Sequence, residues 1–131
     1  MTAYHPRIMC VDDNHDMADS SADLLGILGY DAQACYDGAA ALAMAEDFAP
    51  DICLIDLNMP GMDGDEVAVR LRKTGRAVVL VAVTAMGDEA GRQRIIAAGF
   101  DLHLVKPVDP RTLPGIINAF ERLNSVEAVG N

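Results

Sequence analysis

The sequence predicts an α/β protein built on a doubly wound, five-stranded parallel sheet with the strand order 2-1-3-4-5. Its 131 residues suffice for one domain with a hydrophobic core, and 51% of them are hydrophobic. Short apolar runs alternate five times with segments that have helical signals, a pattern typical of parallel sheets covered by helices. Right-handed crossovers at this size favour the order 2-1-3-4-5. We expect one domain over residues 1–131, with its core at about 7–123 and a tail at 124–131.

The first two strand–helix units have clear boundary signals. An apolar run at residues 7–11 predicts the first strand, and Asn14 is a plausible N-cap for the helix that follows it. Gly29 suits the end of that helix, because glycine readily adopts the left-handed conformation common there. Residues 30–36 are expected to form the second strand, after which Asp37 caps an alanine-rich helix.

The other three units follow the same pattern. We expect strands at 52–55, 77–83 and 102–105, and helices near 65–73, near 88–98 and after Asp109. The third strand ends at Asp56, before a turn-rich loop. The fourth strand is almost wholly apolar, which is typical of a parallel strand buried on both faces. Asp109 is the expected N-cap of the last helix, with Pro110 at the favoured first position.

Composition excludes several classes of function. Acidic residues outnumber basic ones, 20 to 10, which argues against non-specific nucleic-acid binding and against docking on an anionic membrane surface. No apolar run approaches the ~20 residues that span a bilayer, and residues 1–7 contain no hydrophobic signal-peptide core. Cys10, Cys35 and Cys53 each lie in an apolar strand-like run, so we expect buried, reduced thiols and a cytoplasmic location.

Polar side chains follow four of the five predicted strands, at the edge of the sheet where such folds bind ligands. Asp12 and Asp13 follow the first strand and Asp56 the third, while Thr84 and Lys106 follow the fourth and fifth. Three carboxylates beside one ammonium repel one another, and a divalent cation with oxygen ligands neutralises them. Mg²⁺ is the natural candidate. With Mg²⁺ bound, a phosphoryl group on Asp56 would meet Thr84 and Lys106.

These strand ends lie within four motifs of a known family. The motifs are Val11-Asp12-Asp13-Asn14, Ile55-Asp56-Leu57-Asn58-Met59-Pro60-Gly61-Met62-Asp63-Gly64, Val83-Thr84-Ala85 and Leu104-Val105-Lys106-Pro107. With them the chain resembles a response-regulator receiver domain, which has the flavodoxin-like fold of the bacterial chemotaxis response regulator. The resemblance covers roughly residues 7–123. It is specific, because the four motifs fall in order at the ends of four predicted strands.

The resemblance assigns the chemistry of the site. It implies that Asp56 accepts a phosphoryl group from the phosphohistidine of a histidine kinase or a histidine phosphotransfer protein. Asp12 and Asp13 would hold Mg²⁺ together with Asp56. The backbone carbonyl of Asn58 would be a further ligand of the metal.

The resemblance also implies how phosphorylation is read out. Thr84 and Lys106 would bind the phosphoryl oxygens. Thr84 would also act as a switch with His103, which stands where the family usually has Tyr or Phe. The switch would change the surface of the fourth helix, fifth strand and fifth helix, to which a downstream protein binds.

Two other functions fit parts of the pattern. A haloacid-dehalogenase-like aspartyl-phosphate hydrolase also uses Asp, Mg²⁺, Thr or Ser, and Lys, but its nucleophile follows the first motif strand and a second Asp lies two residues later. Here the residue two positions after Asp56 is Asn58, whose amide cannot act as an acid. A flavodoxin-like redox carrier needs a hydroxyl-rich phosphate loop after the first strand, where residues 12–16 are acidic and would repel phosphate.

The expected function is therefore that of a phospho-accepting domain in two-component signal transduction. We expect no enzyme activity beyond self-catalysed phosphotransfer and dephosphorylation. Two settings stay open: a stand-alone response regulator, or the receiver module of a hybrid sensor histidine kinase in a phosphorelay, whose full-length protein would be a histidine kinase. In both we expect a kinase or phosphotransfer partner, no nucleic acid, and no membrane contact by this domain.

Overall fold

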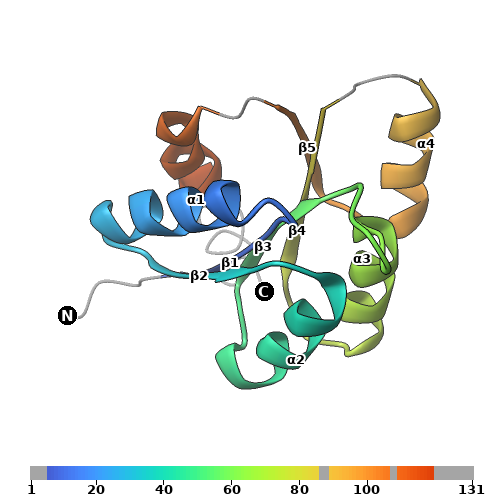
Figure 1. Ribbon diagram of the computed structural model, residues 1–131, viewed down its shortest axis with the longest axis horizontal. Helices are drawn as coiled ribbons and strands as arrows, with labels where there is room; N and C mark the ends of the chain where they lie inside the picture. The colour runs from blue at the N-terminus through green and yellow to red at the C-terminus, as the bar shows by residue number, and fades with distance from the viewer. Residues whose placement is uncertain (1–5, 86–88, 107–108, 120–131) are drawn as a thin grey trace, which may run out of the picture.

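A computed structural model describes residues 6–85, 89–106 and 109–119 of the chain (Figure 1). Five parallel strands form one sheet in the order β2-β1-β3-β4-β5, which confirms the predicted fold class and strand order. The strands are β1 (Arg7–Val11), β2 (Asp31–Cys35), β3 (Ile52–Asp56), β4 (Val79–Thr84) and β5 (Leu102–Val105). The helices are α1 (His15–Ile27), α2 (Gly38–Phe48), α3 (Gly64–Lys73) and α4 (Glu89–Ala98). The expected tail at 124–131 lies outside the described residues.

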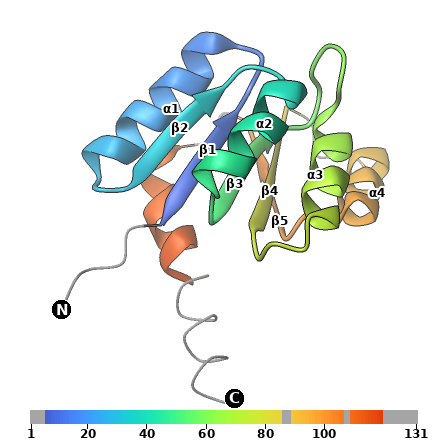
Figure 2. The same ribbon diagram turned by 90° about the horizontal axis from the view of Figure 1, so that it is seen from below.

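Helices cover both faces of the sheet (Figures 1 and 2). The helix over residues 113–119 lies with α1 on one face, and α2 and α3 lie on the other, with α4 beside α3. Successive strand residues point to opposite faces, so Ile8 packs into the core under α1 while Met9 packs into the core under α2 and α3. None of the helices in the described part of the chain is long and apolar enough to cross a membrane.

The N-caps expected for α1 and α2 are confirmed by side-chain hydrogen bonds. The Asn14 side chain accepts a hydrogen bond from the Met17 N–H at 3.2 Å, and Asp37 accepts one from the Ala40 N–H at 2.7 Å. Each contact satisfies a backbone donor that the first helical turn leaves without a partner. Gly29, which follows the end of α1, has a φ of 100°, the left-handed conformation expected there.

All three cysteines are free and buried, as predicted. Burial raises the pKa of Cys10 to about 12 and the pKa of Cys35 to about 11. The thiolate is the reactive form of cysteine, so these thiols are inert at neutral pH and serve as packing groups.

Two boundaries differ by more than one residue from the sequence prediction. β4 begins at Val79 rather than residue 77, and the carbonyl of Val78 instead accepts a hydrogen bond from Nη1 of Arg72 at 2.7 Å. The segment after Asp109 begins as a 3₁₀ turn, η1 (Pro110–Thr112), before the helix over 113–119. The Thr112 N–H bonds the Asp109 carbonyl at 2.9 Å, which is the tighter i to i+3 pattern of that turn.

Candidate functional site

The carboxyl ends of four strands meet at one edge of the sheet and bring the five predicted strand-end residues together. Asp12 and Asp13 follow β1, Asp56 and Thr84 are the last residues of β3 and β4, and Lys106 follows β5. The parallel register aligns these ends, because Val11 pairs with Ile55 and Asp56 pairs with Val83. The backbone N–H of Lys106 donates to the Thr84 carbonyl at 2.7 Å, so the backbone hydrogen bonds between β4 and β5 continue one residue beyond the end of β5.

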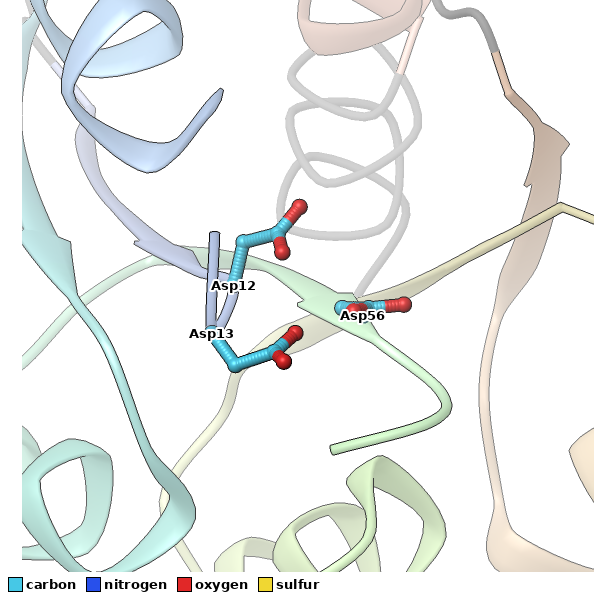
Figure 3. A group of neighbouring side chains, drawn as sticks. All are labelled: Asp12, Asp13 and Asp56. Atoms are coloured by element: carbon cyan, nitrogen blue, oxygen red, sulfur yellow. The ribbon is translucent and has the colours of Figure 1, made fainter. Parts of the chain in front are cut away.

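Three carboxylates form a compact group at this edge. Asp12, Asp13 and Asp56 can each present one oxygen so that all three oxygens lie within 4.8 Å of one another. Figure 3 shows the Asp12 and Asp13 side chains extending from the end of β1 toward the end of β3. Asp12 and Asp56 are only 9% and 6% exposed, whereas Asp13 faces solvent. Carboxylate oxygens open to water on one side fit Mg²⁺, which keeps several waters when proteins bind it.

Lys106 supplies the positive charge next to this group. Its Nζ lies 3.3 Å from Oδ2 of Asp12 and 3.4 Å from Oδ1 of Asp56. Burial lowers the pKa of Lys106, but attraction to Asp56 and Asp12 outweighs it, so the net direction is upward. The ammonium therefore stays charged and sits where it can contact an anion that approaches Asp56.

The carboxylate group destabilises the charged form of Asp56. Burial, followed by repulsion from Asp12, raises the pKa of Asp56 to about 6, although Lys106 acts in the opposite direction. One ammonium does not compensate three carboxylates in a site that is partly shielded from water. A divalent cation would remove this imbalance, so the electrostatics and the donor atoms favour the same kind of ligand.

Gly64 allows the chain to close tightly behind Asp56, and sequence reasoning gave this glycine no role. The Gly64 N–H donates to the Leu57 carbonyl at 2.9 Å, and the Leu57 N–H donates to the Val83 carbonyl at 3.0 Å. A Cβ on residue 64 would overlap the carbonyl oxygen of Asp56 and lie 2.9 Å from Cα of Leu57. The close approach therefore requires glycine at this position.

The predicted ligand residue Asn58 lies in the loop after β3, and its side chain has a partner that the sequence did not indicate. Oδ1 of Asn58 accepts a hydrogen bond from Nη1 of Arg94 at 3.2 Å. Arg94 belongs to α4 and is separated from Asn58 by 36 residues. No local motif links two such distant positions, so only the folded chain reveals this contact.

The two predicted switch residues lie on neighbouring strands. Thr84 is 3% exposed at the end of β4, and His103 on β5 is paired with Ala82 of β4. Leu102 and Leu104 pack into the core under α1, so His103 between them faces the α4 side of the sheet. Its Nε2 is buried and has no hydrogen-bond partner among the described residues.

Comparison with known proteins places this geometry in a family. The chain matches the response regulator receiver domain over residues 8–118. The sensor histidine kinase RcsC of Salmonella typhimurium is 41% identical over 101 residues, which are 77% of this chain and 11% of that protein. The transcriptional regulatory protein PrrA of Mycobacterium leprae is 32% identical over 126 residues, which are 96% of this chain and 54% of that protein.

Solved structures agree with the sequence matches. The CheY-like response regulator receiver domain protein of Methanospirillum hungatei has a TM-score of 0.83 and 28% identity, with 95% of this chain and 98% of that chain covered. The chain spans about half of PrrA and about a tenth of RcsC, so the likeness to those two proteins concerns one domain of each. The match over residues 8–118, the sheet order and the carboxylate group together place the chain in the family of response regulator receiver domains, which act in two-component signalling.

Proposed function

We propose that this receiver domain accepts a phosphoryl group on Asp56 from the phosphohistidine of a histidine kinase or a histidine phosphotransfer protein. The observation that carries the proposal is the convergence of the Asp12, Asp13 and Asp56 oxygens within 4.8 Å. The Lys106 ammonium 3.4 Å from Asp56 adds the anion-binding group that phosphoryl transfer needs. The haloacid-dehalogenase-like hydrolase is set aside, because the chain belongs to the receiver family and has Asn58 where that enzyme needs an acid.

The proposed transfer proceeds by attack of a carboxylate oxygen of Asp56 on phosphorus. The new phosphorus–oxygen bond forms as the phosphorus–nitrogen bond to the donor imidazole breaks, and the imidazole nitrogen keeps the electron pair. Mg²⁺ held by the three carboxylates and the Asn58 carbonyl would neutralise charge on the phosphoryl oxygens. Lys106 and the hydroxyl of buried Thr84 would bind these oxygens from the other side and orient the group for transfer.

The decisive experiment uses small-molecule phosphoryl donors. Incubation with acetyl phosphate or phosphoramidate and millimolar Mg²⁺ should add the mass of one phosphoryl group, and a chelator should prevent the addition. Intact-mass spectrometry measures both results. A protein that gains no phosphoryl group from either donor, or that gains it equally well in chelator, would contradict the proposal.

We propose further that Thr84 and His103 transmit the phosphorylated state to the surface of α4, β5 and the last helix. Ile96 on α4 and Val105 on β5 are 67% and 50% exposed, which suits a docking surface for a downstream protein. Movement of the Thr84 hydroxyl toward a phosphoryl group would change the space next to the β5 side chains. The buried Nε2 of His103, which has no hydrogen-bond partner in the part of the chain that the structure describes, makes its position sensitive to that space.

NMR of the His103 ring tests the switch. Beryllofluoride, a phosphoryl mimic, should shift the His103 ring resonances in the presence of Mg²⁺, while those of His15 on α1 provide an internal comparison. His15 stacks on Tyr36 with ring centroids 3.9 Å apart, and Tyr36 follows β2, which forms the edge of the sheet opposite β5. Identical His103 spectra with and without beryllofluoride would show that this residue takes no part in the switch.

The location, partners and wider setting of this domain complete the proposal. We propose a cytoplasmic location, with no nucleic-acid partner and no membrane contact by this domain, on the basis of a net charge of −10 and three free thiols. Each setting predicted from the sequence has a relative with a matching name: RcsC is a sensor histidine kinase, and the M. hungatei protein is a CheY-like response regulator receiver domain protein. Self-catalysed dephosphorylation would be the only other reaction of this domain.

A further inference from the structure

Arg94 contacts three side chains that border the loop leaving Asp56. Its Nη1 donates to Oδ1 of Asn58 at 3.2 Å, at the start of the loop. Its Nε and Nη2 donate to the two carboxylate oxygens of Asp65 at 3.3 and 3.1 Å, in the first turn of α3. Nη2 also lies 3.7 Å from Oδ2 of Asp63, the N-cap residue of α3. One guanidinium group on α4 therefore fixes both ends of the loop from residue 58 to residue 63.

These contacts fix the orientation of the side chains more than they stabilise the folded protein. The Arg94 and Asp65 side chains are 38% and 31% exposed, and ion pairs at that exposure add little to the free energy of unfolding. The pair nevertheless has two parallel N–H to oxygen bonds, and such a planar fork fixes the orientation of both groups. With its orientation fixed by Asp65, the guanidinium presents a directed donor to Asn58.

Asn58 is the residue through which this contact reaches the metal site. It lies two residues beyond Asp56 in an exposed part of the loop, where the backbone has no strand partner. Loop backbone of this kind stays in place only through the contacts that its residues make. The contact with Arg94 holds the side chain of Asn58, and with it the adjacent carbonyl group.

We propose that Arg94 is a positioning residue of the metal site, which holds Asn58 so that its backbone carbonyl can complete the ligand set of Asp12, Asp13 and Asp56. The proposal rests on the proposed function, because it requires the carboxylate group to bind Mg²⁺. It places a residue that orients a ligand of the site on α4, outside the strand ends that carry the three carboxylates. Groups that orient ligands without touching the metal commonly change metal affinity by about 10- to 100-fold.

The proposal predicts that removing Arg94 changes the affinity for Mg²⁺ in the direction opposite to the one that simple electrostatics predicts. Loss of a positive charge near an acidic site should by itself strengthen cation binding, by a small factor at physiological salt. Loss of the Arg94 contact should instead weaken Mg²⁺ binding, by about tenfold if it acts as other ligand-orienting groups do. Arg94→Lys separates the effect of the hydrogen-bond geometry from the effect of the charge. Lysine keeps the positive charge but cannot form the paired hydrogen bonds to Asp65 together with the hydrogen bond to Asn58.

The experiment titrates unphosphorylated protein with Mg²⁺ alone, followed by isothermal titration calorimetry. Arg94→Lys and Arg94→Ala should both raise the dissociation constant for Mg²⁺ by about tenfold. Arg92→Ala is the matched control: Arg92 lies on the same helix and pairs with exposed Glu89 at 3.9 Å, so its loss should leave the constant unchanged or slightly lower. Melts in chelator should show all variants folded.

Asn58→Ala provides an independent arm, because it leaves the backbone carbonyl and the net charge unchanged. This variant should weaken Mg²⁺ binding to the same extent as Arg94→Lys, and the double variant should be no weaker than either single variant. Equal Mg²⁺ affinity in the parent and Arg94→Lys would overturn the role of Arg94, as would additive effects in the double variant. Failure of the parent itself to bind Mg²⁺ would overturn the proposed function instead.

Discussion

Replacement of Asp56 by asparagine should abolish phosphorylation of the protein by acetyl phosphate and Mg²⁺. Asparagine has nearly the same shape and can stay within reach of Lys106, but its amide oxygen is not an anionic nucleophile and cannot form a stable acyl phosphate. The parent should gain one phosphoryl group by intact-mass spectrometry, and Asp56→Asn should gain none. The effect should be all or none, because the proposal assigns the acceptor role to Asp56 at the end of β3 and leaves Asp12 and Asp13 as ligands of Mg²⁺.

A second aspartate variant serves as the control. Asp16→Asn changes an exposed carboxylate in the first turn of α1, close to the site in sequence but not part of the carboxylate group. It should be phosphorylated to the same stoichiometry as the parent. A phosphoryl adduct that persists in Asp56→Asn would show that another residue is the acceptor.

The same Asp56→Asn variant should change how stability depends on pH in the absence of metal. Burial and Asp12 raise the pKa of Asp56 to about 6 in the folded protein, compared with about 3.9 for an unperturbed aspartate. Between about pH 4 and pH 6 the folded state thus keeps a proton that the unfolded state has lost. The contribution of Asp56 to stability is fully present below this window and is lost as pH rises through it.

Asparagine does not titrate, so the difference in unfolding free energy between the variant and the parent should grow across this window. It should favour the variant above pH 6 by on the order of 2 kcal/mol, a value reduced by the loss of the Lys106 contact. Urea denaturation followed by circular dichroism in chelator measures the difference. A constant difference from pH 4 to pH 7 would show that Asp56 has an ordinary affinity for protons.

Replacement of Gly64 by alanine should destabilise the protein by about 2–3 kcal/mol, a large effect for the addition of one methyl group. The new Cβ would overlap the carbonyl oxygen of Asp56 and crowd Cα of Leu57, and both of these are backbone atoms. Backbone at this point is held by the hydrogen bond from Gly64 to Leu57, so it cannot move without breaking the closure of the loop. The substitution should also weaken Mg²⁺ binding, because the displaced backbone belongs to Asp56 and the residue after it.

Gly26→Ala is the matched substitution with the opposite expected sign. Gly26 lies near the end of α1, and a Cβ added there meets no atom within 4 Å. Alanine should therefore stabilise the helix by up to about 1 kcal/mol. Urea denaturation of the two variants tests the comparison. Equal stability of Gly64→Ala and the parent would show that the loop behind Asp56 can relax at little cost.

The sequence alone determined the fold and the location of the site for two physical reasons. Strand length, apolar content and helix caps are local properties, so the boundaries at Asn14 and Asp37 could be predicted from neighbouring residues. Parallel strands joined by helices all end at the same edge, so residues directly after strands must gather there. For this reason the sequence predicts that five residues lie together at that edge: Asp12, Asp13, Asp56, Thr84 and Lys106.

Tertiary structure decided what depends on contacts between residues that are distant in the chain. The guanidinium of Arg94 reaches Asn58 across 36 residues, and Nε2 of His103 is buried without a partner among the described residues; neither has a local sequence signal. The requirement for glycine at position 64 comes from the approach of its backbone to Asp56, a distance that the pattern of residue types does not contain. Local propensity and periodicity fix which elements form and where they end, whereas the distances between side chains of different elements exist only after the helices have packed onto the sheet.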